Sequence, residues 1–429
     1  MNQPLRVGLA GLGTVGAGTA SLLASNGEIV AQHAGRPVEV IAVAARDRGK
    51  ERGYDVSALR WLDDARLLAR DPEVDVVVEA IGGAEGIARE VVETALDAGK
   101  HVVTANKALL AHHGAELARK AERNNRALAY EAAVAGGIPV IKAMREGLAA
   151  NRITSVYGIL NGTSNYILTE MRRSGREFAE VLKEAQRLGY AEADPSFDVD
   201  GIDAAHKLTL LASVAFGGII PFEEVKVTGI RQVSALDIGF AEELGYRIRL
   251  IGIAHSSPQG VRARVHACLV PGESLIGKVE GVYNAVVTKG NFVGQNVSLG
   301  RGAGAGPTAS AIVADLIDIA RGHILPVFSA PAHRLKPVRM MEDYRGSYYL
   351  RLMVVDKPGV VADIAASLRD ENVSMEQMIQ RGRAPGEPVP IVITTHETSE
   401  SAIERASRRL ATIATIVEPP HIMVIESLE

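Results

Sequence analysis

Residues 190–207 (YAEADPSFDVDGIDAAHK) concentrate carboxylates in a short, turn-rich segment that ends at a lysine. Asp203 and Lys207 are four residues apart, so they would share one face of a helix. Because burial and neighbouring charges shift the pKa of a lysine, Lys207 is a candidate for proton transfer. A substrate ammonium group would be a second cation suited to so many carboxylates. The alternative is an exposed acidic loop followed by an ordinary helical ion pair. The other carboxylates of the segment are Glu192, Asp194, Asp198 and Asp200.

Two further stretches carry groups suited to binding. Residues 131–139 (EAAVAGGIP) place one carboxylate, Glu131, in a small, glycine-rich turn with exposed backbone carbonyls, and such a set can hold a hard cation. The alternative is a domain crossing without an ion. Residues 161–165 (NGTSN) would cap a helix that begins near Tyr166, or donate hydrogen bonds to a carboxylate substrate.

The N-terminus supplies the element that would position a cofactor. Residues 5–10 form an apolar run of strand length, and the glycine turn GLGTVG at residues 11–16 follows it, before a helical stretch from Thr19. In this order the glycines permit a tight turn, close approach of the backbone to a pyrophosphate and close packing of helix on strand. We therefore expect a doubly wound sheet that binds a dinucleotide. Its further strands are predicted at residues 38–44, 74–81, 101–105 and 127–132.

Two basic residues follow strands of this predicted sheet. Arg46 comes just after residues 38–44, where an acidic residue usually holds the ribose, and an arginine there favours a 2′-phosphate and therefore NADP. Asp47 is adjacent, and the alternative for Arg46 is a solvated loop charge. Lys107 comes just after residues 101–105, so it would lie at the carboxyl edge of the sheet near the nicotinamide. The alternative is an ordinary surface lysine.

The remainder of the chain predicts two more units. A mixed sheet is expected in the middle, and the glycines before the apolar helix 309–319 suggest that the chain returns there to cover the cofactor. Residues 347–429 follow the β-α-β-β-α-β order of a ferredoxin-like unit. The predicted protein is thus α/β, with a Rossmann-type domain at residues 1–132 that residues 302–322 complete, a substrate domain at 133–301, a linker at 323–346 and a C-terminal domain at 347–429. The expected middle strands are residues 153–160, 250–255, 262–270, 285–289 and 291–297.

The composition excludes several classes of protein. A net charge of −4 gives no reason to expect nucleic acid or an anionic membrane as a partner. No apolar run is long enough to cross a bilayer, and the N-terminus lacks a signal-peptide pattern. The single cysteine, Cys268, excludes a disulfide within the chain and fits a reducing compartment. We therefore expect a cytoplasmic protein that acts on a small molecule.

Taken together, these motifs resemble homoserine dehydrogenase with a C-terminal ACT regulatory domain, over essentially the whole chain. The resemblance implies reversible, NAD(P)-dependent interconversion of L-homoserine and L-aspartate 4-semialdehyde in threonine, methionine and isoleucine biosynthesis. It also implies a homodimer or homotetramer formed through the middle domain, and an amino-acid effector such as threonine at the ACT domain. The most specific motifs are GLGTVG at 11–16, TANKALL at 104–110, EAAVAGGIP at 131–139, NGTSNYIL at 161–168, GYAEADPSFDVDGIDAAHK at 189–207 and DKPGV at 356–360.

The resemblance also implies roles for individual residues. Lys207 would be the catalytic acid and base, Lys107 its companion near the nicotinamide, and Asp203 the residue that orients Lys207. On the substrate side are Glu192, which would hold the substrate ammonium group, Asp198 and Thr163. Glu131 with the carbonyls of Val134, Gly136 and Ile138 would match a site for a monovalent cation such as Na⁺. The predicted cofactor-binding residues are Gly11, Gly13, Thr14, Val15, Gly16, Arg46, Lys107 and Gly304.

Two other functions fit part of the pattern. An aldehyde-oxidising dehydrogenase would need a nucleophilic cysteine, and Cys268 lies in an apolar run that predicts burial. A sensor would combine the nucleotide-binding and ACT domains without turnover, and the pair Lys107 and Lys207 argues against it. His206, next to Lys207, is predicted to point away from the Asp203–Lys207 face and to serve in packing or polar support.

Overall fold

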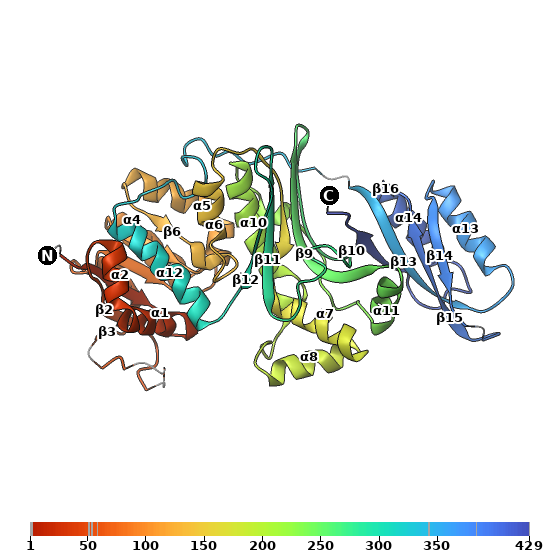
Figure 1. Cartoon of the computed structure of the whole chain (residues 1–429), viewed down its shortest axis with the longest axis horizontal. Helices are drawn as coiled ribbons and strands as arrows, with labels where there is room; N and C mark the ends of the chain where they lie inside the picture. The colour runs from red at the N-terminus through yellow and green to blue at the C-terminus, as the bar shows by residue number, and fades with distance from the viewer. Residues whose placement is uncertain are drawn as a thin grey trace.

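The computed structural model describes residues 3–49, 52, 55–57, 59–341, 344–382 and 384–428. Figure 1 shows an N-terminal part, a central part and a C-terminal part arranged in a row along the longest axis. Within these described ranges, no helix is both long and apolar enough to span a membrane.

The first sheet has six parallel strands in the order β3-β2-β1-β4-β5-β6. The direction of winding reverses between β1 and β4, which is the crevice where dinucleotides bind in doubly wound folds. The strand predicted at residues 127–132 is shorter than expected, because the chain enters the 3-10 helix η1 (Glu131–Ala133) directly after it. The strands are β1 (Leu5–Ala10), β2 (Val38–Ala44), β3 (Arg60–Leu62), β4 (Val76–Glu79), β5 (His101–Thr104) and β6 (Leu128–Ala129).

Helices cover this sheet, and one of them comes from far along the chain. The helix α12 (Ala305–Ala320) packs against α1 so closely that a Cβ on Gly18 would lie 2.9 Å from the carbonyl oxygen of Ala305. Ile312 and Leu316 of α12 are fully buried in the same core as Leu9. The helix α12 therefore shares the core of the nucleotide-binding sheet. The other helices are α1 (Thr14–Ser25), α2 (Gly27–Ala34), α3 (Ala65–Arg70), α4 (Ile87–Asp97) and α5 (Lys107–Arg123).

The second sheet extends through the central and C-terminal parts in the order β12-β11-β7-β9-β10-β17-β13-β15-β14. Its pairs along this path are antiparallel except for β10 with β17, so the sheet is mixed, as predicted. The central strands are β7 (Ile153–Ile159), β8 (Lys226–Val227), β9 (Tyr246–Ser257), β10 (Gly260–Pro271), β11 (Tyr283–Gly290) and β12 (Gly294–Arg301). The central helices are α6 (Val140–Lys142), the π-helix η2 (Ala143–Gly147), α7 (Gly162–Ser174), α8 (Phe178–Arg187), α9 (Ser196–Val199), α10 (Ile202–Phe216), η3 (Phe222–Glu224) and α11 (Ala235–Glu243).

The C-terminal part has the predicted β-α-β-β-α-β order, and its strands continue the sheet of the central part. Cys268 of β10 pairs with Val424 of β17, and Leu350 and Ile393 share a core with Ile253. The predicted linker is also packed, since Phe328 is 4% exposed. The C-terminal elements are β13 (Arg345–Val355), α13 (Val360–Asp370), β14 (Met375–Gln380), β15 (Pro388–Thr395), β16 (Thr398–Ser399), α14 (Glu400–Leu410) and β17 (His421–Ile425).

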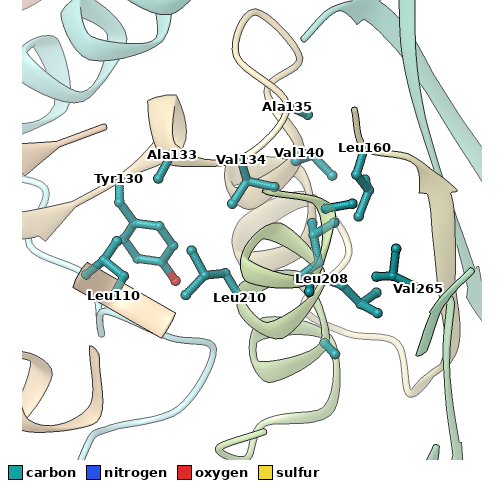
Figure 2. Close-up of a cluster of buried hydrophobic side chains, with 14 of the residues drawn as sticks. Leu110, Tyr130, Ala133, Val134, Ala135, Val140, Leu160, Leu208, Leu210 and Val265 are labelled. Carbon is teal, nitrogen blue, oxygen red and sulfur yellow. The ribbon is translucent and has the colours of Figure 1, made fainter. Parts of the chain in front are cut away.

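A buried cluster joins the nucleotide-binding unit to α10 (Figure 2). Leu110 of α5 and Tyr130 lie against Leu210 of α10, and Val134 lies between Tyr130 and Leu208. These side chains are at most 2% exposed. Because each buried leucine stabilises by about 1.5–3 kcal/mol, this cluster fixes α10 against α5. The two lysines singled out from the sequence lie on these two helices.

Candidate active site

The glycine turn after β1 has the geometry that a dinucleotide requires. Gly11 has φ +100°, and a Cβ there would lie 2.7 Å from the carbonyl oxygen of Ala80. A Cβ on Gly16 would lie 1.9 Å from the carbonyl oxygen of Gly11, so only glycine lets α1 start this close to the strand. A Cβ on Gly13 would meet nothing within 4 Å, which leaves this face of the turn open to a ligand. Thr14 then begins α1, whose free N–H groups favour an anion.

A groove of about 780 Å³ lies on one side of this turn, and Arg46 lines it as an exposed side chain. Arg52 also lines the groove, donates from Nε to the carbonyl oxygen of Leu12 at 3.2 Å, and lies 5.3 Å from the ring of Trp61. Neither Arg52 nor Trp61 was predicted, because no sequence motif around them marks a binding role and the short strand β3, which contains Trp61, was not predicted either. The carboxylates Asp47, Asp63 and Asp64 line the same groove.

A second cleft, of about 510 Å³, lies on the other side of the turn and reaches the central part of the molecule. Val15 of α1 and Gly304 before α12 line its nucleotide side. The predicted catalytic and substrate residues on its walls are Lys107, Thr163, Asp198, Asp203 and Lys207. The fold thus gathers at one cleft residues that are 100 positions apart in the sequence.

At the base of this cleft one carboxylate is shared by two lysines. Lys207 Nζ donates to Asp203 Oδ2 at 2.7 Å and to the carbonyl oxygen of Leu160 at 2.8 Å. Lys107 Nζ lies 3.0 Å from Asp203 Oδ1. Asp203 and Lys207 are 4% and 8% exposed, respectively. The alternative of an exposed acidic loop with an ordinary ion pair therefore does not apply to Asp203 and Lys207.

Burial and the neighbouring charges shift the pKa values of Asp203 and Lys207. Burial raises the pKa of Asp203, but the charges of Lys207 and Lys107 outweigh burial and hold that pKa well below its ordinary value. Burial lowers the pKa of Lys207; the charge of Asp203 opposes this shift and the charge of Lys107 adds to it. Two ammonium groups thus share one anion, and Lys207 is the member that loses its proton more readily than a solvated lysine.

Asn161 positions two of the carboxylates of the acidic segment, Asp198 and Asp203. Its Nδ2 donates to Asp203 Oδ2 at 2.9 Å and to Asp198 Oδ1 at 2.7 Å, and its Oδ1 accepts from the backbone N–H of Ser164 at 2.8 Å. Asn161 is therefore the N-cap of α7, and the helix begins four residues before the predicted start near Tyr166, since Gly162 to Asn165 already have helical geometry. Burial and the charge of Asp203 raise the pKa of Asp198.

Lys107 is positioned by its neighbours at the start of α5. Asn106 is the N-cap of this helix, and its Nδ2 donates to the carbonyl oxygen of Gly83 at 2.7 Å. Glu79, fully buried at the end of β4, accepts from the N–H of Gly82 at 3.0 Å and from the hydroxyl of Thr104 at 2.6 Å. Glu79 was not singled out from the sequence, although a carboxylate inside an apolar run was a visible signal.

The remaining carboxylates of the acidic segment lie outside the cleft. Glu192 is exposed and does not line the cleft. Its backbone is held against α8, because Gln186 Nε2 donates to the carbonyl oxygens of Glu192 and Ala193 at 3.0 and 3.2 Å. Asp200 pairs with Arg231. Thr163 lines the cleft and donates its hydroxyl to the carbonyl oxygen of Tyr190 at 2.8 Å, so this residue holds the rim of the cleft.

The turn around Glu131 already satisfies its carboxylate from the backbone. Both oxygens accept N–H groups, from Ile141 and Lys142, at 2.8 Å each. The carbonyl of Ile138 accepts from the N–H of Val140 at 2.7 Å. Burial and the charge of Asp315 raise the pKa of Glu131 to about 7, so this buried group favours a nearby cation. Throughout the described ranges, no three His, Cys, Asp or Glu side chains gather as a metal site.

His206 and Cys268 take no part in the cleft. The ring of His206 stacks on Phe222 with centroids 4.4 Å apart, and burial lowers its pKa to about 4, so it packs as a neutral ring. Cys268 is 0% exposed in β10, and burial raises its pKa well above the ordinary value. A buried thiol of this kind is not a nucleophile, which removes the aldehyde-oxidising alternative.

A doubly wound sheet, an open glycine turn and an acid–base group at the adjoining cleft define a dinucleotide-dependent oxidoreductase. A family model described as "Homoserine dehydrogenase, NAD binding domain" matches residues 11–131, and one described as "Homoserine dehydrogenase" matches residues 139–317. The homoserine dehydrogenase of Neisseria gonorrhoeae is 46% identical over 99% of both chains. The chain belongs to the homoserine dehydrogenase family of NAD(P)-dependent oxidoreductases.

Solved structures agree with this assignment. A crystal structure of a homoserine dehydrogenase from Thiobacillus denitrificans has 46% identity and a TM-score of 0.94, covering 100% of this chain and 99% of that one. A hyperthermophilic archaeal homoserine dehydrogenase in complex with NADPH has 26% identity and a TM-score of 0.64, covering 76% of this chain and 100% of that one. A shorter chain can therefore carry the family's fold.

Proposed function

We propose that the cleft reduces L-aspartate 4-semialdehyde to L-homoserine, reversibly, with Lys207 as the group that gives and takes the proton. The observation that carries this proposal is the buried Lys207–Asp203–Lys107 group beside the glycine turn. NAD(P)H, when bound, supplies the hydride. Reduction of an aldehyde also needs a proton at its oxygen, and a lysine whose pKa is lowered by burial gives up its proton more readily than a solvated lysine.

The neighbours of Lys207 set its state. Asp203 keeps the ammonium group oriented, since it accepts from Lys207 at 2.7 Å, and its charge opposes the lowering of the Lys207 pKa by burial. Lys107 is less buried, with a side chain 29% exposed, and lines the same cleft. A second cation there stabilises negative charge that develops on the substrate oxygen and favours loss of the proton from Lys207. In the oxidative direction the same residues would accept the proton of the homoserine hydroxyl.

Substrate specificity is assigned to the acidic side of the cleft. Asp198 is half-buried and bonded to Asn161, so it presents a fixed carboxylate to the ammonium group of an amino-acid substrate. Thr163 is proposed to support the rim at Tyr190. Glu192 remains a proposed ammonium ligand, because its neighbours Gly189 and Tyr190 line the cleft, and its role requires the 190–194 loop to move inward.

NADP is the favoured cofactor. Arg46 and Arg52 line the groove beyond the glycine turn, and two guanidinium groups suit a 2′-phosphate. The archaeal relative in complex with NADPH is consistent with this preference.

A monovalent cation such as Na⁺ is proposed at Glu131 with the carbonyls of Val134, Gly136 and Ile138, where a positive ion would lower the raised pKa of the carboxyl group.

Residues 347–429 are proposed to be an ACT regulatory domain that binds an amino-acid effector such as threonine. The support is the DKPGV loop and a cavity of about 440 Å³ lined by Asp356, Gly359 and Gln380.

A homodimer or homotetramer is proposed through the central sheet. Its edge strand β12 exposes Leu299, and the turn before it exposes Phe292, at 60% and 89% respectively. Exposed apolar groups at an unpaired edge are typical of an interface.

The proposal is tested by following NADPH absorbance with L-aspartate 4-semialdehyde and, in reverse, NADP⁺ with L-homoserine. We expect turnover in both directions with the wild-type protein, and none with Lys207→Ala, although that variant still binds NADPH. Turnover like that of the wild type in Lys207→Ala would refute the assignment of Lys207. No turnover by the wild-type protein in either direction would refute the proposed function.

A further inference from the structure

The segment of residues 227–237 joins the acidic side of the cleft to the C-terminal part of the chain. It begins beside β8, runs past α9, and ends in the first turn of α11. We propose that this segment is a strut that positions Asp198 and Asp203 for substrate binding, and that it is anchored at its far end by residues of β13 and β17. The inference rests on the proposed function of the cleft, and it adds Arg231 and Asp237 as positioning residues.

At the cleft end, the strut holds α9 by backbone and side chain. The N–H of Ile230 donates to the carbonyl oxygen of Val199 at 2.8 Å. Arg231 Nη2 donates to Asp200 Oδ2 at 3.1 Å and to the hydroxyl of Ser196 at 2.9 Å. The guanidinium group therefore binds residues on both sides of Asp198, two positions away in each direction. A paired carboxylate and hydroxyl fix the orientation of α9 more firmly than a single contact would.

The backbone of the strut packs closely against the acidic segment at this end. A Cβ on Gly229 would lie 2.2 Å from the carbonyl oxygen of Val199 and 2.5 Å from the Cα of Asp200. The strut thus lies in direct contact with the backbone of the acidic segment. Because α9 leads within three residues to α10, which carries Asp203 and Lys207, a shift of α9 would move the carboxylates of the cleft.

At the far end, Asp237 is 0% exposed and collects five hydrogen bonds. Two come from Ser234, whose hydroxyl and N–H lie 2.7 and 3.0 Å from Oδ2 and complete a capping box at the start of α11. The other three come from the C-terminal part: the Tyr349 hydroxyl at 3.0 Å, Arg351 Nε at 2.8 Å and His421 Nδ1 at 3.1 Å.

A fully buried carboxylate is stable only while these donors remain in place. Although burial opposes it, the bond and charge of His421 and the bond of Arg351 hold the pKa of Asp237 well below its ordinary value. The anchor is therefore a charged junction between the two parts, and its bonds fix where the strut ends. Loss of the C-terminal donors would release the strut from that end.

The inference is tested with Arg231→Ala, Arg231→Lys, Asp237→Asn and the double variant Arg231→Ala with Asp237→Asn. We expect each single loss to raise KM for L-homoserine by about threefold to tenfold, which corresponds to about 1 kcal/mol of lost positioning, with the Kd for NADPH changed less than twofold. Arg231→Lys should recover part of the loss. The double variant should be no worse than the poorer single variant, since both act through one strut.

The matched control is Arg173→Ala. Like Arg231, Arg173 is an exposed arginine of the central part, and its ion pairs are with Glu280 and Glu170, which lie outside the acidic segment. The KM of the Arg173→Ala variant for L-homoserine should equal that of the wild type. If Asp237→Asn does not fold, Tyr349→Phe removes one bond to the same carboxylate and should still raise KM. The proposal of a strut would be overturned by an unchanged KM in the Arg231 variants, or by losses that multiply in the double variant. The proposed function is tested separately, by turnover of the wild-type protein.

Discussion

Replacing Asp203 by asparagine tests the shared carboxylate directly. Asparagine keeps the size of the side chain and its bond from Asn161 through one oxygen, but it removes the charge that Lys207 and Lys107 share. At an effective dielectric constant of about 20, charges about 3 Å apart attract by about 5–6 kcal/mol in each pair before desolvation is counted. After desolvation, breaking a buried pair of this kind costs about 3–5 kcal/mol, because an uncompensated charge stays buried.

The expected kinetic effect has a direction as well as a size. In the wild type, the charge of Asp203 raises the pKa of Lys207 against burial, so its loss lowers that pKa further. Reduction needs a protonated Lys207, and its rate should therefore fall at neutral pH by about 10²-fold or more, the usual worth of general acid catalysis. The limb of the pH–rate profile at high pH should move to lower pH.

The assay is the rate of NADPH consumption with L-aspartate 4-semialdehyde as a function of pH, together with the melting temperature. The matched control is Asp194→Asn, the same change in the same segment, at an exposed residue that does not line the cleft and whose carboxylate accepts from the N–H of Ser196 at 3.0 Å. The control should keep the wild-type profile. A rate within twofold of the wild type and an unmoved profile in Asp203→Asn would refute the reasoning about the shared charge.

Three other predictions follow from the geometry. Arg46→Ala should raise the Kd for NADPH at least tenfold and that for NADH less than twofold, measured by fluorescence titration; equal losses would remove Arg46 from phosphate recognition. Na⁺ at pH 8 should raise the melting temperature of the wild type but not of Glu131→Gln, since the folded pKa of Glu131 is raised to about 7 and its charged form is stabilised by a cation; an equal rise in both would place the ion elsewhere. For His206, the folded pKa of about 4 lies below the unfolded value of 6.5, so the unfolded chain binds the proton first and stability falls as pH drops through this window. At pH 5.5 the loss is about 1.4 kcal/mol, and His206→Phe should lack this part of the decline in chemical denaturation; the same decline in that variant would contradict it.

Some features of this protein are decided within short stretches of sequence. The turn at residues 11–16 needs glycine because of its own local geometry, with φ +100° at Gly11, and the strand and helix around it were predicted for the same reason. The pairing of Asp203 with Lys207 follows from helical spacing alone, since residues four apart meet on one face. These parts were predictable because the interacting groups are close in the chain.

Other features depend on contacts between residues far apart, and the sequence pattern carries no signal for them. Lys107 reaches Asp203 only because the cluster around Tyr130 packs α5 against α10. The position of Glu192 was predicted inside the cleft but depends on how α8 holds its backbone. Residues 347–429 were predicted as a C-terminal domain, and no sequence pattern indicated that β17 pairs with β10 of the central sheet.

The sequence by itself determined the class of cofactor and the pairing of Asp203 with Lys207, because both follow from residue types at short, regular spacing. Only the tertiary structure decided which of the acidic residues face the cleft and how the parts are joined. The reason is physical: hydrogen bonds and packing between distant segments, such as those of Arg351 to Asp237, depend on the whole fold being formed.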